Sequence, residues 1–317
     1  MSFEQESQQS QIERAIDRAY HNDGSVVDKL LEALSQISDR ETRLRIIKAL
    51  ARFKERKIAA KFLYILQKDK DEEIKVKVAS LLGLVGSSEI SNQLLPYLAD
   101  KNSQIRAGIA KSLSIIKDNN MVEPLIEAVK TEQNEEVLEK LLFALGVLAD
   151  ERATGILMEV LANSSNPARR NQAVLGLGWI KDRRAVDLLL EVMLNDEDED
   201  VRSNAADALG EIGDKRVESA LIQVLTGQPE IAHIAAEALG NLRSTKAVSP
   251  LLASILNKEQ YIGTRFMAIE ALEKIGDRSK EVFETLKNIS NDNEMYEDTT
   301  LGSFALEVIE KLKRRDS

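Results

Sequence analysis

Aliphatic and small residues recur along this chain with a period of about 32 residues. Each copy centres on a leucine, and successive leucines are 30 to 33 residues apart. The residue that follows the leucine has little or no side chain in most copies, and in five of them it is glycine. A fixed period of this size is typical of stacked repeats, in which one unit cannot bury its apolar face alone. The anchor leucines are Leu50, Leu82, Leu113, Leu145, Leu177, Leu209, Leu239 and Leu272.

The spacing around each anchor predicts a helix. Ala205, Ala208, Leu209 and Ile212 follow the i, i+3, i+4, i+7 pattern of an amphipathic helix. Glycine is unfavourable inside a helix, so its recurrence after the anchor predicts that another backbone approaches closely there. A short turn follows, and then a second apolar run begins, so each repeat is predicted to be a helical hairpin. The clearest second runs cover residues 121–129, 153–161, 185–194, 217–225 and 247–256.

No break in the period marks a linker, which predicts one continuous domain over residues 1–317. Residues 1–40 form an N-terminal cap with helices at 12–20 and 26–37, residues 41–290 form the repeats, and residues 291–317 contain a C-terminal capping helix at 301–312. Terminal repeats need a polar outer face, and both ends of the chain are polar. The expected fold is all-α, a right-handed α-α superhelix of about eight to nine helical hairpins.

Composition agrees with this fold and excludes several functions. The chain has no cysteine, which excludes thiol catalysis, disulfides and cysteine metal sites. It shows no leader segment and no apolar run of about 20 residues, the length that crosses a bilayer. We therefore expect a cytoplasmic protein without a membrane span.

The repeat resembles the HEAT repeat, in particular the short bacterial type called the PBS-lyase HEAT-like repeat. That type is similar in having an arginine near the start of the first helix, then small residues, then ALGxIGD. The best copy here joins Arg202 to Ala205 and Leu209-Gly210. The resemblance implies a bacterial source and a ladder of ion pairs between basic helix starts and acidic groups of neighbouring repeats. The column seven positions before the anchor reads Arg43, Lys75, Arg106, Leu138, Arg170, Arg202, Ala232 and Arg265.

Three functions are associated with HEAT-like proteins, and each requires particular residues. Deoxyhypusine hydroxylase needs repeated His-Glu pairs, but neither His21 nor His233 is followed by Glu. HEAT-like DNA glycosylases bind in a basic groove, whereas this chain has a formal charge of −10 and only 4% aromatic residues, which argues against nucleic acid. A phycobilin lyase subunit, or a phycobilisome assembly or degradation factor, remains an alternative, with a bilin as its ligand. No phosphate loop or catalytic constellation is apparent, so we expect no catalytic, cofactor-binding or metal-binding residues.

The resemblance implies that the second helices line the concave face. On that face the central repeats present a strip of carboxylates, with two tyrosines at its N-terminal end. Neighbouring helices lie about 10 Å apart, close to the Debye length, so these charges act together. The predicted partner-binding strip consists of Tyr64, Tyr97, Glu123, Glu127, Glu159, Asp187, Glu191 and Gln223.

These features predict a non-catalytic scaffold, adaptor or chaperone-like module that binds a protein partner carrying a basic segment or helix. Trp179, the single tryptophan, occupies a column that is polar in the next three repeats, so it is either a hot spot on the convex face or packed against a neighbouring helix. The acidic run 195–200 is expected to cap the next helix. The sequence leaves the oligomeric state open.

Overall fold

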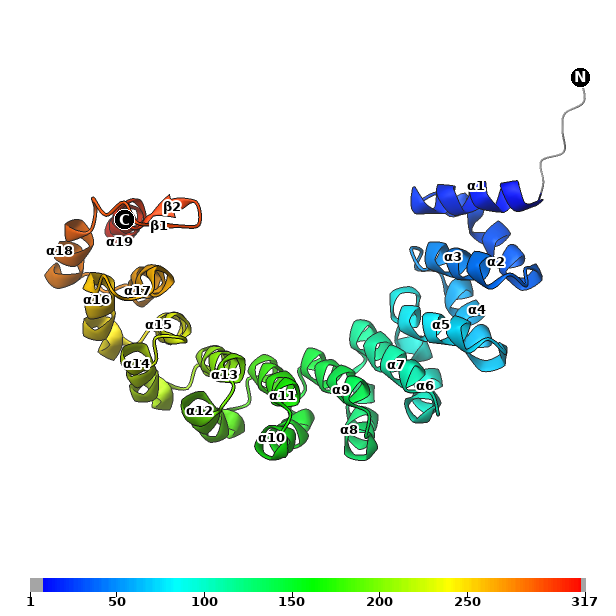
Figure 1. Cartoon of the computed structure of the whole chain (residues 1–317), viewed down its shortest axis with the longest axis horizontal. Coiled ribbons are helices and arrows are strands. Elements are labelled where there is room, and N and C mark those ends of the chain that lie inside the picture. Colours follow the sequence, from blue (N-terminus) through cyan, green and yellow to red (C-terminus); the bar gives the residue numbers. More distant parts are fainter. Residues whose placement is uncertain (1–7, 315–317) are drawn as a thin grey trace, which may run out of the picture. The chain divides into compact units, whose positions relative to one another are not determined.

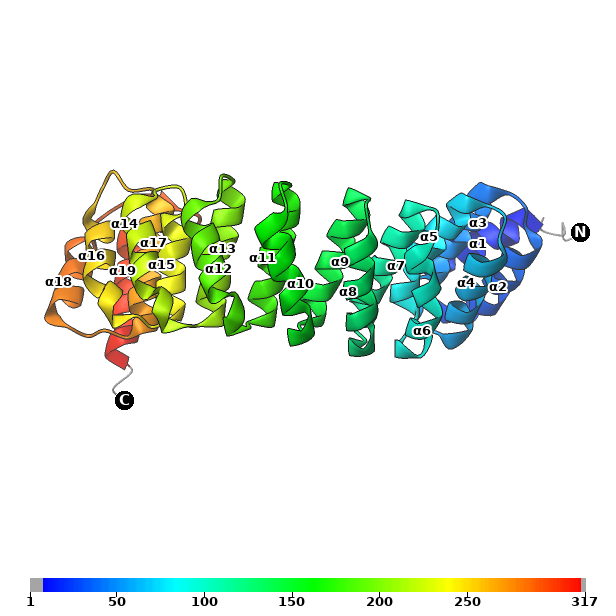
Figure 2. The ribbon, with the colours of Figure 1, turned by 90° about the horizontal axis from the view of Figure 1, so that it is seen from below.

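The computed structural model describes residues 8–314 as two compact units. One unit ends at Ala153 and the other begins at Thr154. Each unit is a stack of helical hairpins, and Figure 2 shows the successive helices of a unit standing side by side. The expected all-α solenoid is therefore confirmed within both units, whereas the single continuous domain stays a prediction. Residues 1–7 and 315–317, the outermost parts of the predicted caps, lie outside the described residues.

The first unit contains nine α-helices and five short 3₁₀ turns among its described residues (Figure 1). Its elements are α1 (Gln8–Tyr20), η1 (Gly24–Val26), α2 (Val27–Gln36), α3 (Arg40–Leu50), α4 (Arg56–Lys68), α5 (Glu72–Val85), η2 (Ser88–Ile90), α6 (Ser91–Leu94), η3 (Leu95–Ala99), α7 (Ser103–Ile116), η4 (Asn119–Met121), α8 (Val122–Thr131), α9 (Glu135–Leu148) and η5 (Glu151–Ala153).

The second unit continues the pattern and adds a small β-hairpin before its last helix. Its elements are α10 (Thr154–Asn163), α11 (Pro167–Ile180), η6 (Arg183–Ala185), α12 (Val186–Asn195), α13 (Glu199–Ile212), η7 (Lys215–Val217), α14 (Glu218–Gly227), α15 (Ala232–Asn241), η8 (Thr245–Ala247), α16 (Val248–Leu256), α17 (Ile262–Ile275), α18 (Lys280–Asn288), β1 (Met295–Tyr296), β2 (Thr299–Thr300) and α19 (Leu301–Arg314).

The predicted hairpin is observed in each repeat. All eight anchor leucines are buried, with at most 1% of their surface exposed. The aspartate that follows the first helix caps the turn that starts the second: the Asp182 carboxylate accepts from the backbone N–H of Arg184 at 2.9 Å, and Asp214 accepts from that of Arg216 at 3.0 Å. These 3₁₀ turns connect the first helix to the second.

Successive first helices approach each other at the glycine that follows the anchor. A Cβ added to Gly83 would lie 2.7 Å from Cα of Ser112, and one added to Gly210 would lie 2.9 Å from Cα of Ala238. Real side chains do not tolerate such distances, so only glycine permits this backbone contact. The close approach predicted from the sequence is confirmed.

This contact decides which helices face inward. In each unit the first helices, such as α5, α7, α13 and α15, lie along the inner side of the curve, and the second helices lie along the outer side (Figure 1). A stack curves toward the side on which its helices pack more closely, and the glycines bring the first helices together. The expectation that the second helices line a concave face is wrong for both units.

The C-terminal hairpin β1–β2 was not predicted from the sequence. Met295 pairs with Thr300 and Tyr296 with Thr299, and the Tyr296 ring lies 5.1 Å from that of Phe266 in α17. Two residues per strand are too few to show an alternating pattern. The predicted capping helix, in contrast, is present as α19.

The glycine contact gives a stability prediction within the second unit. Gly210→Ala places a methyl group against the backbone of α15, so we expect a loss of about 1–2 kcal/mol in the free energy of unfolding despite the better helix propensity of alanine. Gly155→Ala is the matched control, because nothing lies within 4 Å of a Cβ at that helical position. Thermal unfolding should show a lower midpoint for Gly210→Ala and an unchanged or higher midpoint for Gly155→Ala. Equal midpoints for the two variants would contradict the contact.

A turn aspartate gives a pH-dependent prediction. The Asp182 carboxylate accepts hydrogen bonds from the Arg184 Nε at 2.7 Å and from the Thr154 hydroxyl at 2.9 Å. These bonds favour its charged form and lower its pKa from 3.8 to about 2. A carboxyl with a lowered pKa stabilises the fold above its unfolded pKa and loses this contribution as the pH falls toward its folded pKa. Asp182→Asn should therefore cost about 1–2 kcal/mol at pH 6, allowing for the partly exposed arginine, and clearly less at pH 3.

Asp207 provides a control of opposite sign. The Asp207 residue is exposed at the surface, but partial desolvation by its surroundings and the nearby Glu211 carboxylate outweigh the Lys181 ammonium and raise the pKa of Asp207 above its usual value. The charged form is therefore unfavourable in the fold, and Asp207→Asn should raise the unfolding midpoint at pH 6 and have little effect at pH 3. If both asparagine variants shifted the unfolding midpoint in the same direction at pH 6, the opposite pKa shifts of Asp182 and Asp207 would be contradicted.

Candidate functional site

Grooves separate successive second helices on the outer side of each unit. The first unit has a groove of about 550 Å³ between α2 and α4 and one of about 670 Å³ between α4 and the α6–η3 segment. The second unit has a groove of about 510 Å³ between α10 and α12. Their volumes fall in the range of small-molecule or peptide-binding clefts.

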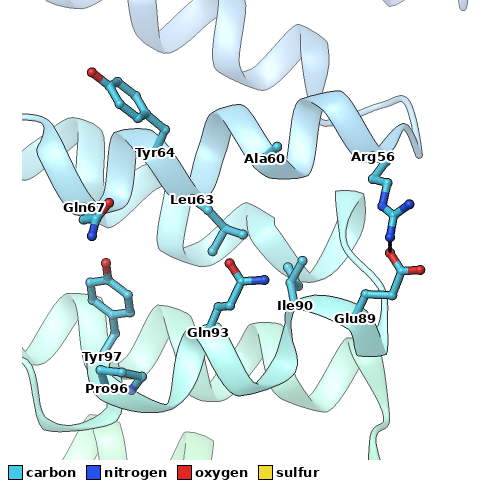
Figure 3. A pocket seen from close by; sticks show the side chains of 10 residues that line it. All are labelled: Arg56, Ala60, Leu63, Tyr64, Gln67, Glu89, Ile90, Gln93, Pro96 and Tyr97. Atoms are coloured by element: carbon cyan, nitrogen blue, oxygen red, sulfur yellow. Dashed lines mark ion pairs between the residues drawn. The ribbon is translucent and has the colours of Figure 1, made fainter.

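The groove between α4 and α6–η3 is the largest of the three (Figure 3). Pro96 interrupts the second helix of this repeat, which continues as the 3₁₀ segment η3 because proline has no N–H to donate. Leu63 of α4 faces Gln93 of α6 across the middle of the groove (Figure 3). The Arg56 guanidinium, 2.9 Å from the Glu89 carboxylate, crosses one end of it.

The two predicted tyrosines both line this groove, but they have different surroundings. Tyr97 projects from η3 toward Gln67 of α4, and burial raises the pKa of its hydroxyl (Figure 3). Tyr64 is 60% exposed and points away from α6, so it also borders the groove between α2 and α4. The Lys61 ammonium lies 5.6 Å from the centre of its ring, a cation–π distance. The Tyr64 side chain thus separates the two grooves and borders both of them.

In the first unit the predicted carboxylates already have cations beside them. The Glu127 carboxylate pairs with the Lys130 ammonium at 2.7 Å. Glu123 lies 3.9 Å from the Arg152 guanidinium. Both are exposed residues of α8, on the outer side of the unit, so their placement on a concave face was wrong.

In the second unit two predicted carboxylates are unpaired. Asp187 lies 3.3 Å from the Arg216 guanidinium. Among the residues that the structure describes, neither Glu159 of α10 nor Glu191 of α12 has a cation at ion-pair distance, and both are exposed. Glu191 lines the groove between α10 and α12. Gln223 is exposed on α14. These residues also lie on the outer side of their unit, not on the expected concave face.

Trp179 is 43% exposed and belongs to α11, a first helix. Since first helices lie on the inner side of the unit, its predicted position on a convex face was wrong. Its partial exposure keeps it as a candidate contact residue.

The basic residues at the starts of the first helices are structural. The Arg106 guanidinium bonds to Glu132 at 2.6 and 2.8 Å, and Arg170 bonds to Asp196 at 2.8 Å through two nitrogens. Each of these carboxylates lies in the loop that leads to the next repeat. The expected ion pairs between arginines at helix starts and acidic groups are therefore observed for Arg106 and Arg170. Each pair holds the loop between two repeats in place, so these arginines are not available to a partner protein. The 195–200 run has the expected capping role, since Asp198 accepts from the backbone N–H of Val201 at 3.1 Å.

The described residues contain no group of three or more histidine, aspartate or glutamate side chains arranged to hold a metal ion. His233 is partly buried and lies edge-on to Tyr261, with ring centres 6.2 Å apart. Across residues 8–314, every helix is too short or too polar to span a bilayer.

Comparison with known proteins agrees with this architecture. The family model for HEAT repeats matches residues 59–146, 122–209, 154–229 and 218–298. Those segments together run over more than half of the sequence. The chain therefore belongs to the HEAT-repeat family. No curated protein sequence shows a significant match to it.

Solved structures share the fold at low sequence identity. Kap95p, the yeast importin-β, from a structure concerned with its binding to RanGDP, is 14% identical with a TM-score of 0.66, covering 97% of this chain and 49% of Kap95p. The Escherichia coli protein YibA is 21% identical with a TM-score of 0.57, covering 88% of this chain and 100% of YibA. The CpcE–CpcF phycocyanin lyase complex of Nostoc is 16% identical, with coverage of 90% and 94%, but its TM-score of 0.37 is too low to support an argument. The chain thus spans about half the length of Kap95p.

Several groove residues were missed by the sequence analysis. Leu63, Ile90 and Gln93 line the main groove beside the predicted tyrosines. The available signal was Pro96, which falls in the middle of a second apolar run and predicts a broken helix. Which side chains then face the groove depends on the packing of two helices and is not encoded in the period.

The structural role of the arginines can be tested at Arg170. Its side chain is 9% exposed and that of Asp196 is 7% exposed, so Arg170→Ala leaves a buried carboxylate without its partner. We expect a loss of about 3 kcal/mol in the free energy of unfolding. Arg202→Ala is the control, because within the described residues the Arg202 guanidinium bonds to backbone carbonyls, at 2.9 and 3.4 Å, and to no carboxylate. This substitution should cost about 1 kcal/mol. Similar midpoints in chemical denaturation would contradict the structural role of the Arg170 pair.

Proposed function

We propose that this chain is a non-catalytic protein–protein interaction scaffold or adaptor, of the kind that includes chaperone-like modules. The observation that carries the proposal is the groove between α4 and α6–η3 with Tyr64 on its rim and Tyr97 in its wall. Tyrosine is enriched among residues that dominate binding energy at protein interfaces, because it offers a large apolar face and one hydrogen-bonding group. A partner segment seated here would bury Leu63, Tyr97 and one face of Tyr64.

The chemistry of the groove favours a peptide over a small polar substrate. Its wall joins apolar side chains with two amides, Gln67 and Gln93, which can bond to the backbone of an extended or helical segment. It is open along its length, and such a site excludes water poorly, which disfavours catalysis. Proteins of similar fold bind other proteins: Kap95p binds RanGDP, and Kap121p has been solved bound to Nup53p.

The partner is proposed to carry a basic segment. On the outer side of the second unit, Glu159 and Glu191 are exposed and without ion pairs among the described residues. A lysine or arginine of the partner could pair with each without displacing an internal cation. Charge complementarity of this kind raises association rates and selects among partners more than it adds affinity.

The proposal is tested by photo-crosslinking in native lysate. Tyr64 is replaced by a benzophenone amino acid, and Tyr261, which is 57% exposed in a loop of the second unit, is replaced in the same way as a matched control. We expect one protein to crosslink from position 64 and not from position 261. Identical crosslinking profiles from both positions would reject the groove as a docking site.

The basic partner is tested separately with charge variants. Glu159→Lys combined with Glu191→Lys should weaken capture of the crosslinked protein several-fold, because each exposed pair contributes about 0.2–1 kcal/mol. Glu230→Lys combined with Glu281→Lys changes the net charge equally at exposed positions elsewhere in the unit and should leave capture unchanged. Equal effects of the two pairs would indicate a dependence on net charge alone.

The phycobilin lyase alternative predicts a different result. A lyase subunit binds a free bilin and changes its absorption spectrum, whereas a scaffold does not. Bilin titration of the purified chain therefore separates the two functions without knowledge of the protein partner.

A further inference from the structure

Three lysines on the inner side of the first unit form a positively charged cluster. They are Lys48 of α3, Lys77 of α5 and Lys111 of α7. Each belongs to a first helix, and these helices lie along the inner side of the unit (Figure 1). Lys48 and Lys111 are exposed and Lys77 is partly buried. We refer to Lys48, Lys77 and Lys111 as the lysine cluster.

The lysine cluster has no internal counter-charge. Across the described residues, no carboxylate lies at ion-pair distance from any of its three ammonium groups. Burial and the charges of Lys48 and Lys111 lower the pKa of Lys77, so the Lys77 ammonium lies within electrostatic reach of the lysine on each side of it. In contrast, Arg45 on α3 bonds to Glu13 at 2.5 and 2.7 Å. An uncompensated cluster is unexpected in a chain with a formal charge of −10.

Exposed aliphatic side chains lie on the same face of the same helices. Leu84 follows Lys77 by seven positions on α5, and Ile115 follows Lys111 by four positions on α7, spacings that place each pair on one helix face. Leu84 is 41% exposed and Ile115 is 37% exposed. A row of cations beside a row of aliphatic residues is a two-part surface, charged along one edge and apolar along the other.

Helices α5 and α7 are closely packed on this face. Ser112 of α7 lies against Gly83 of α5, where its hydroxyl accepts from the Gly83 N–H at 2.9 Å and donates to the Ala79 carbonyl at 2.6 Å. Packed helices are about 8–10 Å apart, so lysines on neighbouring first helices are within reach of one bound segment. Residues seven apart on an α-helix are separated by about 10.5 Å along its axis. A helix laid across α3, α5 and α7 could therefore bring one carboxylate per heptad to the lysine cluster.

We propose that the inner face of the first unit, formed by the lysine cluster with Leu84 and Ile115, binds an acidic amphipathic helix of a partner protein. The carboxylates of the partner pair with the lysines, and its apolar side chains cover Leu84 and Ile115. Charge complementarity identifies this occupant, since the partner supplies the counter-charge that the unit lacks. The aliphatic residues favour protein over single-stranded nucleic acid, whose bases stack on aromatic side chains. This site is separate from the outer groove, and the acidic helix that it would bind is opposite in charge to the basic segment proposed for Glu159 and Glu191.

The test uses a defined probe and the full-length chain. The probe is a fluorescent 21-residue helical peptide that carries glutamates and leucines along one face in a heptad pattern. Binding is measured by fluorescence anisotropy for the unaltered chain and for Lys48→Glu, Lys77→Glu and Lys111→Glu combined. We expect the triple variant to bind at least about tenfold more weakly, because three ion pairs with the peptide are lost and replaced by repulsion. A peptide with lysine in place of each glutamate should not bind this face.

A matched control separates the site from the effect of net charge. Lys68→Glu, Lys70→Glu and Lys101→Glu combined make the same charge change at exposed positions of the same unit. This control should bind the acidic peptide as the unaltered chain does. Equal weakening by the two triple variants, or no binding of the peptide to the unaltered chain, would overturn the proposal.

Two further measurements keep the result unambiguous. Leu84→Ser combined with Ile115→Ser should weaken binding of the peptide without changing the salt dependence of that binding, because only the apolar edge of the site is lost. Displacement of the peptide by an equal concentration of single-stranded DNA would also overturn the proposal, in favour of nucleic acid. Crosslinking at Tyr64 does not depend on the lysine cluster, so failure here leaves the outer-groove function to be judged on its own test.

Discussion

The structure depends on one backbone contact that is repeated along each unit. Where two first helices meet, a glycine on one lies against the backbone of the next, as Gly83 does against Ser112 and Gly240 against Ala271. Because these helices approach so closely, they lie on the inner side of the curve, and the second helices are spread apart on the outer side. The grooves between second helices are a consequence of this geometry. The absence of a side chain at these glycines therefore lets the first helices pack closely, and this packing separates the second helices that form the outer grooves.

The charges of the chain are divided between structure and surface. Arg106 and Arg170 are held by carboxylates in the loops between repeats, where both partners are largely removed from water. Such pairs fix the geometry of a loop more than they add net stability, because desolvation offsets most of the attraction. Among the described charges without an ion pair are Glu159 and Glu191 on the outer side of the second unit and the lysine cluster on the inner side of the first.

This division gives a repeat protein several binding surfaces from one kind of unit. The buried positions are constrained by the close approach of the helices and by the anchor leucines, so they vary little from repeat to repeat. The exposed positions on either face are free to differ, as the column that holds Leu84, Ile115, Trp179 and Glu211 shows. A scaffold of this design can carry an aromatic groove and a basic face without a change of fold.

The sequence by itself determined the repeat, the helical hairpin and the glycine contact, because these follow from local periodicity. Leu82 and Leu209 are buried as the pattern requires, and Asp182 caps the turn that its position predicts. The sequence also found Tyr64, Glu159 and Glu191 as exposed residues of the second helices. It did not determine on which side of the stack they lie, since periodicity places a residue on a helix face but not on the inner or outer side of a curve. Only the tertiary structure decided that side, because curvature arises from the packing distances between helices that are about 30 residues apart in the chain.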